Sequence, residues 1–429
     1  MLDINYIREH QEEVKQAAAN KQLDPQVVEQ FLVLDQERRR HLQETEHLRA
    51  QSNQNAATIK KSLMEHGGKP DADLVAKGKT LKEELKVAEE KLKVFDQQFK
   101  EMSLQIPNVP AEDVPLGKDE SGNQVVRQVG EIKKLPFTPK SHEDLMLNLD
   151  LLDIKRAVQI GGFRTYMLKK QAVVLEQALL NYALKMMIDE GFTALTAPVL
   201  VNREAMVGTG YFPWGQEDHY YTQDQQILAG TAEVALTSFY AGETLNERDL
   251  PIKMIGISPC FRREVGTYGK DTKGIIRVHQ FNKVEQVVYT IANEKVTREW
   301  HQKMVGFAEK LLQDLGLPYQ VLLMCTGDMG AGQRKKYDIE TWFPAQGRYR
   351  ETHSASYFND FQARRLNIKY RASDGTVKYV YTLNNTVAAS PRLLAAVVEN
   401  YQREDGSVVV PEVLRPFTGF EEIKAVKLT

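Results

Sequence analysis

Residues 261–281, FRREVGTYGKDTKGIIRVHQF, bring cationic and aromatic side chains together around a loop that contains glycines. If both halves are extended, Arg262 and Glu264 share one face of the first half, and Arg277 and Phe281 share one face of the second. Arginine can bind a phosphate or carboxylate through two parallel hydrogen bonds, and a ring beside arginines suits stacking on a base. Cross-strand ion pairs on an exposed sheet face are the alternative explanation. The stretch alone therefore predicts either a nucleotide site or salt-bridged strands.

The composition limits the class of protein. The 429 residues, 42% hydrophobic and 27% charged, suit a globular chain of two domains. The net charge of -2 argues against a globally basic nucleic-acid coat, so any RNA binding must be local. Cys260 and Cys325 form no CxxC motif or His/Cys cluster, so neither a disulfide framework nor structural zinc is expected. The N-terminus MLDINYIREHQEE has no apolar signal core, and no apolar run reaches the roughly 20 residues that cross a bilayer. We expect a cytoplasmic protein without a membrane partner.

The N-terminal region has the spacing of two long helices. Apolar residues alternate four and three apart from Leu74 to Met102, and a weaker seam runs from Val27 to about Met64. HGGKPDAD, residues 66–73, breaks the pattern between them. The two stripes predict an antiparallel helical hairpin over about 27–102, with arms roughly 55 to 60 Å long. A dimerising coiled coil is the alternative.

The composition changes after the hairpin. QIPNVPAEDVPLGKDESGNQ, residues 105–124, is rich in Pro, Gly and acidic residues and indicates a linker. We therefore expect an N-terminal domain over 1–104, a linker over 105–135 and a larger domain over 136–429. The larger domain begins with a predicted helix over 163–191, and its clearest strands are joined by hairpin-length loops, which predicts an α+β fold with a mainly antiparallel sheet flanked by helices. These strand-like runs are PIKMIGIS, IIRVHQFNKVEQVVYTIA, YDIETWFPA and VKYVYTLNNT.

Several stretches together resemble one family. Residues 261–281 look like motif 2 of the class II aminoacyl-tRNA synthetases, in the form found in the seryl-tRNA synthetase family. The region of Pro198 is similar to motif 1, and the N-terminal hairpin also fits, so the resemblance covers nearly the whole chain. Further stretches match in the same order: LAGTAEVAL (228–236), FNKVE (281–285), YRETHSASYFNDFQARR (349–365) and DGSVVVPEVLRPF (405–417).

The resemblance implies an ATP site. Arg262 would bind the α-phosphate and the reacting carboxylate, because its planar fork makes two hydrogen bonds. Glu264 would accept from the adenine amino group, Phe281 would stack on the ring, and backbone near Val278 would complete the adenine edge. Arg263 stands where the family often has serine, and its place on the alternate face suggests support of the loop or a phosphate contact.

A metal subsite is implied by the segment ETHS. Glu351 and Ser354 resemble the positions that hold Mg²⁺ against the ATP phosphates, and Thr352 and His353 line the same segment. Oxygen ligands suit this hard ion. For a Glu and a Ser alone, an ordinary surface turn would be the simpler explanation.

The last motif departs from the class pattern. Class II enzymes have a glycine-rich strand that leads into a helix with an arginine, whereas NNTVAASPRLLAAVVENYQ (384–402) has Ala388, Ala389 and Ser390 in those places. Pro391 suits the first helical position, and Arg392 near the positive end of that helix would reach the γ-phosphate.

The amino-acid site implied by the resemblance contains carboxylates for an ammonium group and polar partners for a hydroxyl. Such a site rejects alanine by about 10⁴ because buried partners would be left unpaired, and it refuses threonine by lack of room for a methyl group. No zinc-ligand cluster is present, so selection through zinc is not expected. The residues are Thr231, Ala232, Glu233, Arg262, Glu285, Asn384 and Thr386.

The implied activity is ATP-dependent ligation of L-serine to tRNA in protein biosynthesis, through a seryl-adenylate. The resemblance implies a homodimer, with tRNA(Ser) and by extension tRNA(Sec) as partners, and a hairpin that reaches the long variable arm. On the hairpin only the patch from Arg38 to Arg40, with Lys60 and Lys61, offers phosphate contacts, and such a run is more simply a solvated helix face.

Two other functions remain open. One is a ligase that loads an amino acid onto a carrier protein, which would have no need of the long hairpin. The other is a coiled-coil interaction protein with a decayed catalytic fold. Decay is opposed by the joint presence of Arg262, Glu264, Glu285, Glu351 and Arg392.

Overall fold

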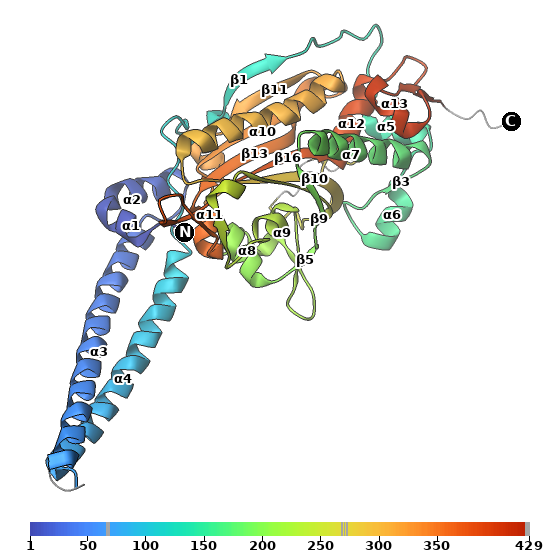
Figure 1. Cartoon of the computed structure of the whole chain (residues 1–429). Helices are drawn as coiled ribbons and strands as arrows, with labels where there is room; N and C mark the ends of the chain where they lie inside the picture. The colour runs from blue at the N-terminus through green and yellow to red at the C-terminus, as the bar shows by residue number, and fades with distance from the viewer. Residues whose placement is uncertain (66–68, 267–268, 270, 272, 425–429) are drawn as a thin grey trace. The chain divides into compact units, whose positions relative to one another are not determined.

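The structure is a computed structural model, and the chain forms two compact units (Figure 1). One unit contains residues 2–19 and 23–107, and the other contains residues 1, 20–22 and 108–429. Both cysteines are buried and outside any disulfide. Within the part of the chain that the structure describes, no helix combines the length and apolar content needed to span a bilayer. The described residues are 1–65, 69–266, 269, 271 and 273–424, so parts of the predicted break at 66–73 and of the loop at 266–274 lie outside them.

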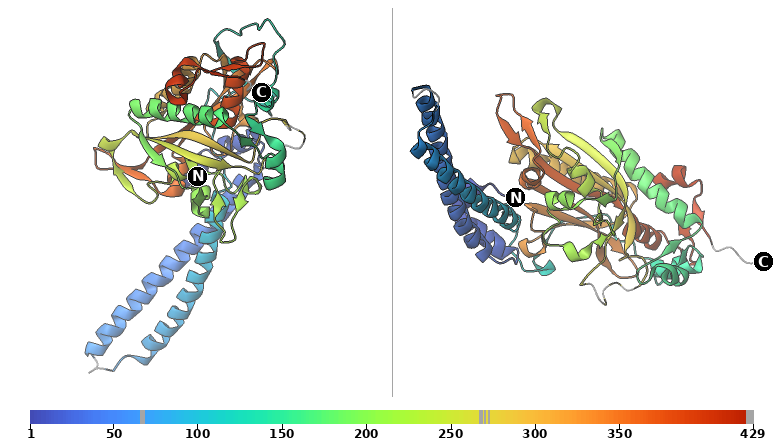
Figure 2. Two further views of the ribbon diagram at one scale, coloured as in Figure 1. Left: turned by 90° about the vertical axis from the view of Figure 1, so that its right-hand side faces the viewer. Right: turned by 90° about the horizontal axis from the view of Figure 1, so that it is seen from below.

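The N-terminal unit contains the predicted helical hairpin. Helices α3 (Gln26–Glu65) and α4 (Ala72–Ser103) lie side by side and antiparallel (Figures 1 and 2). Near their base the rings of Phe31 and Phe99 are 4.8 Å apart, and those of His41 and Phe95 are 4.6 Å apart. The two apolar stripes therefore cover each other within one chain, as predicted for a hairpin.

Polar side chains explain why the seam of α3 weakens. Thr45 and Asn55 are buried on the side of α3 that meets α4. Asn55 donates from Nδ2 to the carbonyl of Leu74 at 3.0 Å, and a Cβ atom added at Gly78 would lie 3.0 Å from that nitrogen. The glycine in the α4 seam thus leaves room for a buried amide.

A buried ion pair fixes the first helix, α1 (Ile4–Glu9), to α3. Asp35 is fully buried, and Arg8 donates to both of its oxygens, from Nη2 at 2.8 Å and from Nε at 2.9 Å. Arg39 reaches the same carboxylate at 3.1 Å.

Replacing Arg8 by methionine is expected to lower the free energy of unfolding of this unit by about 3 kcal/mol, because a buried carboxylate loses its main partner. Urea denaturation followed by far-ultraviolet circular dichroism would measure the loss. The matched control is Arg40→Met, whose pair with Glu37 is exposed on both sides, with an expected change within about 0.5 kcal/mol. Equal losses in the two variants would contradict the role of the buried pair.

The larger unit, which contains residues 108–429, is built on an eight-stranded sheet that is antiparallel except between β4 and β9, which confirms the predicted fold class. The order across the sheet is β1 (Gln124–Val129), β11 (Tyr319–Leu323), β12 (Lys335–Phe343), β13 (Arg348–Asn359), β16 (Tyr381–Ala389), β10 (Gln280–Thr290), β9 (Ile252–Phe261) and β4 (Thr193–Thr196).

Alternation along β10 separates the two faces of the sheet. Val284 and Val288 belong to the main core, together with apolar residues of α7 (Gln171–Asp189), α10 (Glu294–Asp314) and α12 (Ser390–Asn400). Val287 and Tyr289 belong to a second cluster with residues of α9 (Glu233–Thr237) and α11 (Phe361–Leu366). Lys283 and Glu285 share that second face by alternation and are both buried.

Two predicted elements are shorter than expected. The strand predicted from Ile275 begins only at Gln280, so the stretch after Phe261 is loop up to that point, where described. The helix predicted over 163–191 begins at Gln171, because Arg164 and Lys170 have positive φ angles of 61° and 53°, which a helix does not accommodate. In both cases the sequence pattern of the element already begins several residues before the strand or helix itself starts.

Candidate active site

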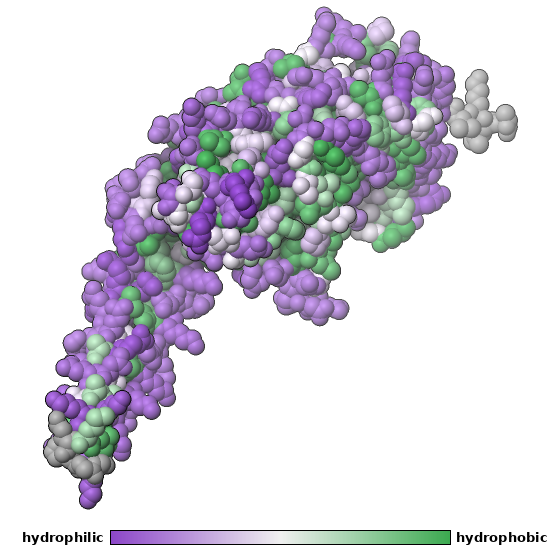
Figure 3. All heavy atoms as spheres, in the orientation of Figure 1, coloured by the Kyte–Doolittle hydropathy of each residue, from purple (hydrophilic) through white to green (hydrophobic). Residues whose placement is uncertain are grey.

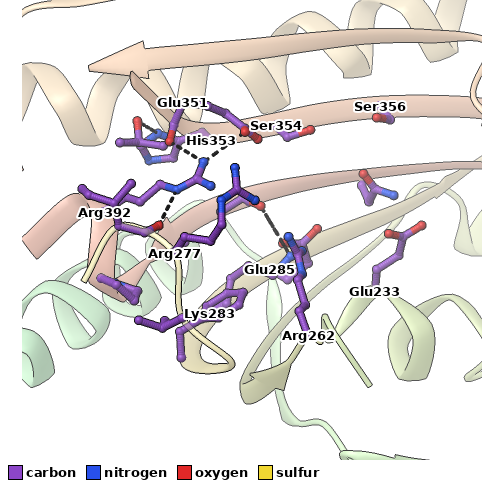
Figure 4. A pocket seen from close by; sticks show the side chains of 18 of the residues that line it. Glu233, Arg262, Arg277, Lys283, Glu285, Glu351, His353, Ser354, Ser356 and Arg392 are labelled. Carbon is purple, nitrogen blue, oxygen red and sulfur yellow. Dashed lines mark hydrogen bonds and ion pairs between the residues drawn. The ribbon is translucent and has the colours of Figure 1, made fainter. Parts of the chain in front are cut away.

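A cavity of about 260 Å³ lies between the loop after β9 and strands β10, β13 and β16 (Figure 4). Arg392 and Glu351 lie at one end of it, and Glu233 lies at the other. The sequence-predicted residues that line it are Glu233, Arg262, Glu264, Val278, Phe281, Glu285, Glu351, Thr352, His353, Ser354, Asn384, Thr386 and Arg392.

Glu351 and Arg392 form the charged end of the cavity. Arg392, in the first turn of α12, donates from Nη1 to Glu351 Oε2 at 3.0 Å and to the Glu351 carbonyl at 2.9 Å. Removal from bulk water would raise the pKa of Glu351, but Arg392, Lys336 and Arg262 outweigh it and lower the pKa to about 2. Glu351 is therefore a carboxylate at any working pH.

A bulge in β13 explains how Glu351 and Ser354 can both serve this end. Ile339 of β12 pairs with His353, whereas Glu340 pairs with Glu351, so Thr352 is an extra residue. One extra residue restores positions three apart to the same face of a strand. Thr352 and His353 bond to each other at 2.8 Å, and burial lowers the pKa of His353 to about 4, so its ring is neutral.

The oxygen donors at this end fit a divalent cation. Ser354 lies opposite Asp338 in the β12–β13 pairing, and Asp338 Oδ1 is a buried oxygen without a hydrogen-bond partner. Oxygen donors of this kind are the ligands that Mg²⁺ accepts. Beyond Glu351 and Arg392, a second cavity of about 580 Å³ is lined in part by Arg277, Lys336 and Arg350.

The middle of the cavity is formed by the loop that follows β9. The guanidinium carbon of Arg262 lies 5.3 Å from the centre of the Phe281 ring, and Arg262 Nε donates to the Gly230 carbonyl at 3.3 Å. Glu264, at a φ of 56°, accepts from Arg277 Nη1 at 2.6 Å. An aromatic ring, two arginines and a carboxylate thus face one space.

Arg263 is directed elsewhere. Its Nη1 donates to the Glu217 carbonyl at 2.9 Å and its backbone N–H to the Asp218 carbonyl at 3.0 Å, and it does not line the cavity. Its contacts support the short 3-10 helix (Gln216–Asp218) before β6 (Tyr220–Tyr221).

Glu233 and Glu285 form the other end of the cavity. Glu285 Oε2 lies 2.5 Å from Lys283 Nζ and accepts from Thr386 Oγ1 at 3.0 Å. Burial and the charge of Glu285 raise the pKa of Glu233, while hydrogen bonds from Tyr211 and Gln362 oppose this shift. These bonds run from Tyr211 to Oε2 at 2.7 Å and from Gln362 Nε2 to Oε1 at 3.0 Å.

Thr231 and Ala232 lie next to Glu233 in the chain and stabilise this end without facing the cavity. Thr231 Oγ1 accepts from the Glu233 backbone N–H at 3.1 Å, and Ala232 packs in the second core cluster. Both are buried, and neither lines the cavity.

Sequence reasoning missed three residues of this end. Lys283 had a signal, because it alternates with Phe281 and Glu285 in FNKVE. Gln362 lies within the matching stretch 349–365, although nothing there distinguished it from its neighbours, and Tyr211 had no signal because it stands alone 22 residues before Glu233. Gln362 is itself fixed by Thr382, which donates to Oε1 at 2.6 Å.

Comparisons with known families agree with this geometry. Residues 1–110 match the seryl-tRNA synthetase N-terminal domain. Residues 217–401 match the tRNA synthetase class II core domain of the glycine, histidine, proline, serine and threonine enzymes.

Curated relatives and solved structures cover the full length. Serine–tRNA ligases of Deinococcus radiodurans and Caldicellulosiruptor bescii are 42% and 43% identical, over 99% of this chain and 99% and 100% of their own. The structure of Pyrococcus horikoshii seryl-tRNA synthetase complexed with ATP aligns over all of both chains at 40% identity, with a TM-score of 0.92. Cytoplasmic serine–tRNA ligase of Naegleria fowleri in complex with AMP aligns over 99% of both chains at 31% identity, with a TM-score of 0.88. The chain belongs to the seryl-tRNA synthetase family, within the class II aminoacyl-tRNA synthetases.

Proposed function

We propose that the chain is a serine–tRNA ligase that activates L-serine with ATP in the cavity described above and then transfers the seryl group to tRNA(Ser). The observation that carries the proposal is the order of groups along one cavity. Carboxylates that suit an ammonium group lie at one end, Glu351 and Arg392 lie at the other, and Arg262 lies between them (Figure 4). Phe281 lies 5.3 Å from the guanidinium carbon of Arg262.

Each group has a task in the proposed reaction. The serine carboxylate attacks the α-phosphorus of ATP, the bond to the bridging oxygen breaks, and pyrophosphate leaves. Arg262 holds the carboxylate and the α-phosphate together and offsets the charge of the transition state. Phe281 stacks on adenine, Glu264 accepts from its amino group, and the backbone near Val278 completes that edge. The pyrophosphate would leave through the second cavity, which lies beyond Glu351 and Arg392.

Glu351 and Ser354 would hold Mg²⁺ against the phosphates. The ion supplies charge neutralisation to the polyphosphate. Thr352 and His353 keep the bulged segment in place through their mutual bond, and Arg392 anchors Glu351 to the start of α12.

Selection of serine is proposed to rest on hydrogen bonds. Glu233 and Glu285 would accept from the ammonium group. Thr386, which donates to Glu285, and Asn384, which lines the same cavity, would share the binding of substrate polar groups. Lys283 neutralises part of the acidic charge, so that the zwitterion enters a nearly balanced site. We propose that zinc takes no part.

Replacing Tyr211 by phenylalanine is expected to raise the KM for serine by about tenfold and to change the KM for ATP by less than about twofold, because the hydroxyl holds only Glu233. Since the bond from Tyr211 lowers the pKa of Glu233, its loss raises that pKa, and the defect should grow as the pH falls. Steady-state ATP–pyrophosphate exchange at several pH values measures both effects. Tyr182→Phe is the matched control, because its hydroxyl donates to Asp314 at the same 2.7 Å outside the cavity. Equal KM values for serine in the two variants would show that the Tyr211 hydroxyl does not contribute to serine binding.

The proposed partners extend beyond the cavity. The unit that contains the hairpin, within the proposed domain 1–104, would bind tRNA(Ser), and we extend the proposal to tRNA(Sec). Residues 105–135 are proposed as the connection to a catalytic domain over 136–429, but this stretch contains β1, which pairs with β11 at the edge of the large sheet. The arginines of the predicted basic patch are all ion-paired with acidic residues: Arg38 with Asp96, Arg39 with Asp35 and Arg40 with Glu37. This pairing favours a solvated helix face for the run.

A homodimer is supported by exposed apolar side chains. Ile160, in the last turn of α6 (Ile154–Gly161), is 74% exposed, and Phe163, two residues after this helix, is 56% exposed. Figure 3 shows apolar residues gathered over the part of the larger unit that contains α6 and α7. Such residues favour a covering partner, and we propose a second copy of this chain.

The proposed location is the cytoplasm, because free thiols such as those of the two buried cysteines suit a reducing compartment.

Serine-dependent ATP–pyrophosphate exchange followed by charging of tRNA(Ser) tests the function. Exchange that depends on serine, with charging, is the expected result. Absence of exchange would refute the activity, and exchange without charging would favour the carrier-protein ligase. The match of residues 1–110 to the seryl-tRNA synthetase N-terminal domain disfavours that second function.

A further inference from the structure

A buried histidine outside the motifs contacts the backbone that leads into the nucleotide side of the cavity. His142 is the first residue of α5 (His142–Asn148) and is 4% exposed. Its Nε2 accepts from the backbone N–H of Ile275 at 3.3 Å. Its Nδ1 lies 2.8 Å from Oε1 of Glu399, which is fully buried on α12.

These contacts define the state of the ring. A ring nitrogen that accepts from an N–H carries no proton, so the proton is on Nδ1, which donates to Glu399. The backbone N–H of His142 donates to the same Glu399 oxygen at 3.1 Å, and the other oxygen accepts from the Ala345 N–H at 3.1 Å. Both ring nitrogens of His142 and both carboxylate oxygens of Glu399 therefore take part in hydrogen bonds, and these bonds hold the ring in one orientation.

The residue before Ile275 leaves no free space beside the ring. Gly274 has a φ of +68°, and a Cβ atom there would lie 2.2 Å from His142 Nε2. The backbone of Gly274 therefore packs directly against the imidazole. A glycine is required at this position both for the angle and for the approach.

The histidine adds a second link between this segment and α12. Arg392 Nε donates to the carbonyl of Ile276 at 3.0 Å, which is the direct link. Arg392 and Glu399 are seven residues apart, or about two turns, so they lie on the same side of α12. Ile275 is linked to Glu399 through the two hydrogen bonds of the His142 ring. The next residues, Arg277 and Val278, line the cavity.

We propose that His142 is a positioning residue for ATP, which fixes residues 275–278 on α12 so that the adenine edge and Arg277 stand ready for the nucleotide. The proposal rests on the function proposed above, since it assumes that ATP occupies this cavity. Without His142 the Ile275 N–H loses its buried acceptor, and the segment keeps the hydrogen bond from Arg392 to Ile276 and its apolar packing in the main core. ATP then has to order the segment when it binds, and its affinity falls.

Two substitutions separate the two bonds of the ring. In His142→Asn the amide can still donate to Glu399, because it reaches the place of Nδ1, but it cannot reach the Ile275 N–H. In His142→Gln the longer side chain can return an acceptor to Ile275. The matched control is His301→Asn, because His301 is 1% exposed, bonds to the Ala355 carbonyl through Nε2 at 3.0 Å, and does not line the cavity.

ATP–pyrophosphate exchange with the full chain measures the effect. His142→Asn is expected to raise the KM for ATP about tenfold and to leave the KM for serine within about twofold, and His142→Gln is expected to recover the KM for ATP to within about threefold. His301→Asn should leave both KM values unchanged. A histidine that only stabilises the fold would lower the melting temperature in both Asn variants without changing the KM for ATP, and that result would overturn the proposal.

Two measurements keep the test independent of activity. Equilibrium dialysis of ATP alone should show the same loss of affinity in His142→Asn, even if the unmodified chain fails to use serine, in which case only the proposed function fails. Hydrogen–deuterium exchange of residues 273–281 in the unmodified chain without nucleotide should show a slowly exchanging Ile275 amide. Rapid exchange of that amide would overturn the proposal without any variant.

Discussion

Replacement of Arg262 by alanine is expected to reduce serine-dependent ATP–pyrophosphate exchange by about 10³-fold or more, because in the proposed reaction this one side chain binds both reacting groups and its charge matters most in the transition state. The fold should persist, since the Arg262 side chain bonds to the protein from Nε to the Gly230 carbonyl, while the bonds of its backbone to His279 remain in the variant. The melting temperature of the variant checks this point. Exchange at a rate within about tenfold of the unmodified chain would remove Arg262 from the reaction.

The neighbouring arginine provides the control. Arg263 donates to the backbone of Glu217 and lies outside the cavity, so Arg263→Ala should change the exchange rate by less than about fivefold. A comparable loss in both variants would mean that the loop as a whole, and not the Arg262 guanidinium, governs the rate.

The long elements of the fold could be predicted from the sequence because their signals are periodic. The seam from Leu74 to Met102 repeats often enough to define a helix, and the break before it leaves a hairpin as the simplest way to cover two stripes. The predicted strand from Ile275 failed at its start for the opposite reason. Alternation of Arg277, His279 and Phe281 looks the same in a strand and in an extended loop, and only the missing ladder partners distinguish them.

The site was predictable where it is contiguous in sequence. The segment ETHS predicts Glu351 and Ser354 as a pair, but their common face depends on the extra residue Thr352 in β13, and no residue type marks a bulge of this kind. Tyr211 and Gln362 meet Glu233 only through the packing of separate loops and helices. Contacts between single residues at such separations leave no pattern in one sequence.

Shortening the hairpin is the second large expected effect. Deleting residues 44–92 and joining Gln43 to Lys93 with a short glycine–serine linker is expected to leave the KM values of the exchange reaction within about twofold, and to reduce charging of tRNA(Ser) on the order of 10²-fold. The cut keeps the base of the hairpin, because the Phe31–Phe99 and His41–Phe95 ring contacts and the Arg38–Asp96 ion pair lie below it. A linker of this length can join two antiparallel helices.

The two effects should separate because none of the described residues between 44 and 92 lines the cavity, so serine activation should not depend on this part of the hairpin. Charging needs the acceptor end of the tRNA at the adenylate, and that end is oriented by contacts elsewhere on the RNA. Rates of charging at low and at moderate salt distinguish lost phosphate contacts from a damaged site, because only lost contacts weaken the dependence on salt. Normal charging by the shortened chain would show that the hairpin does not bind tRNA, and a joint loss of exchange and charging would show that the two units act as one.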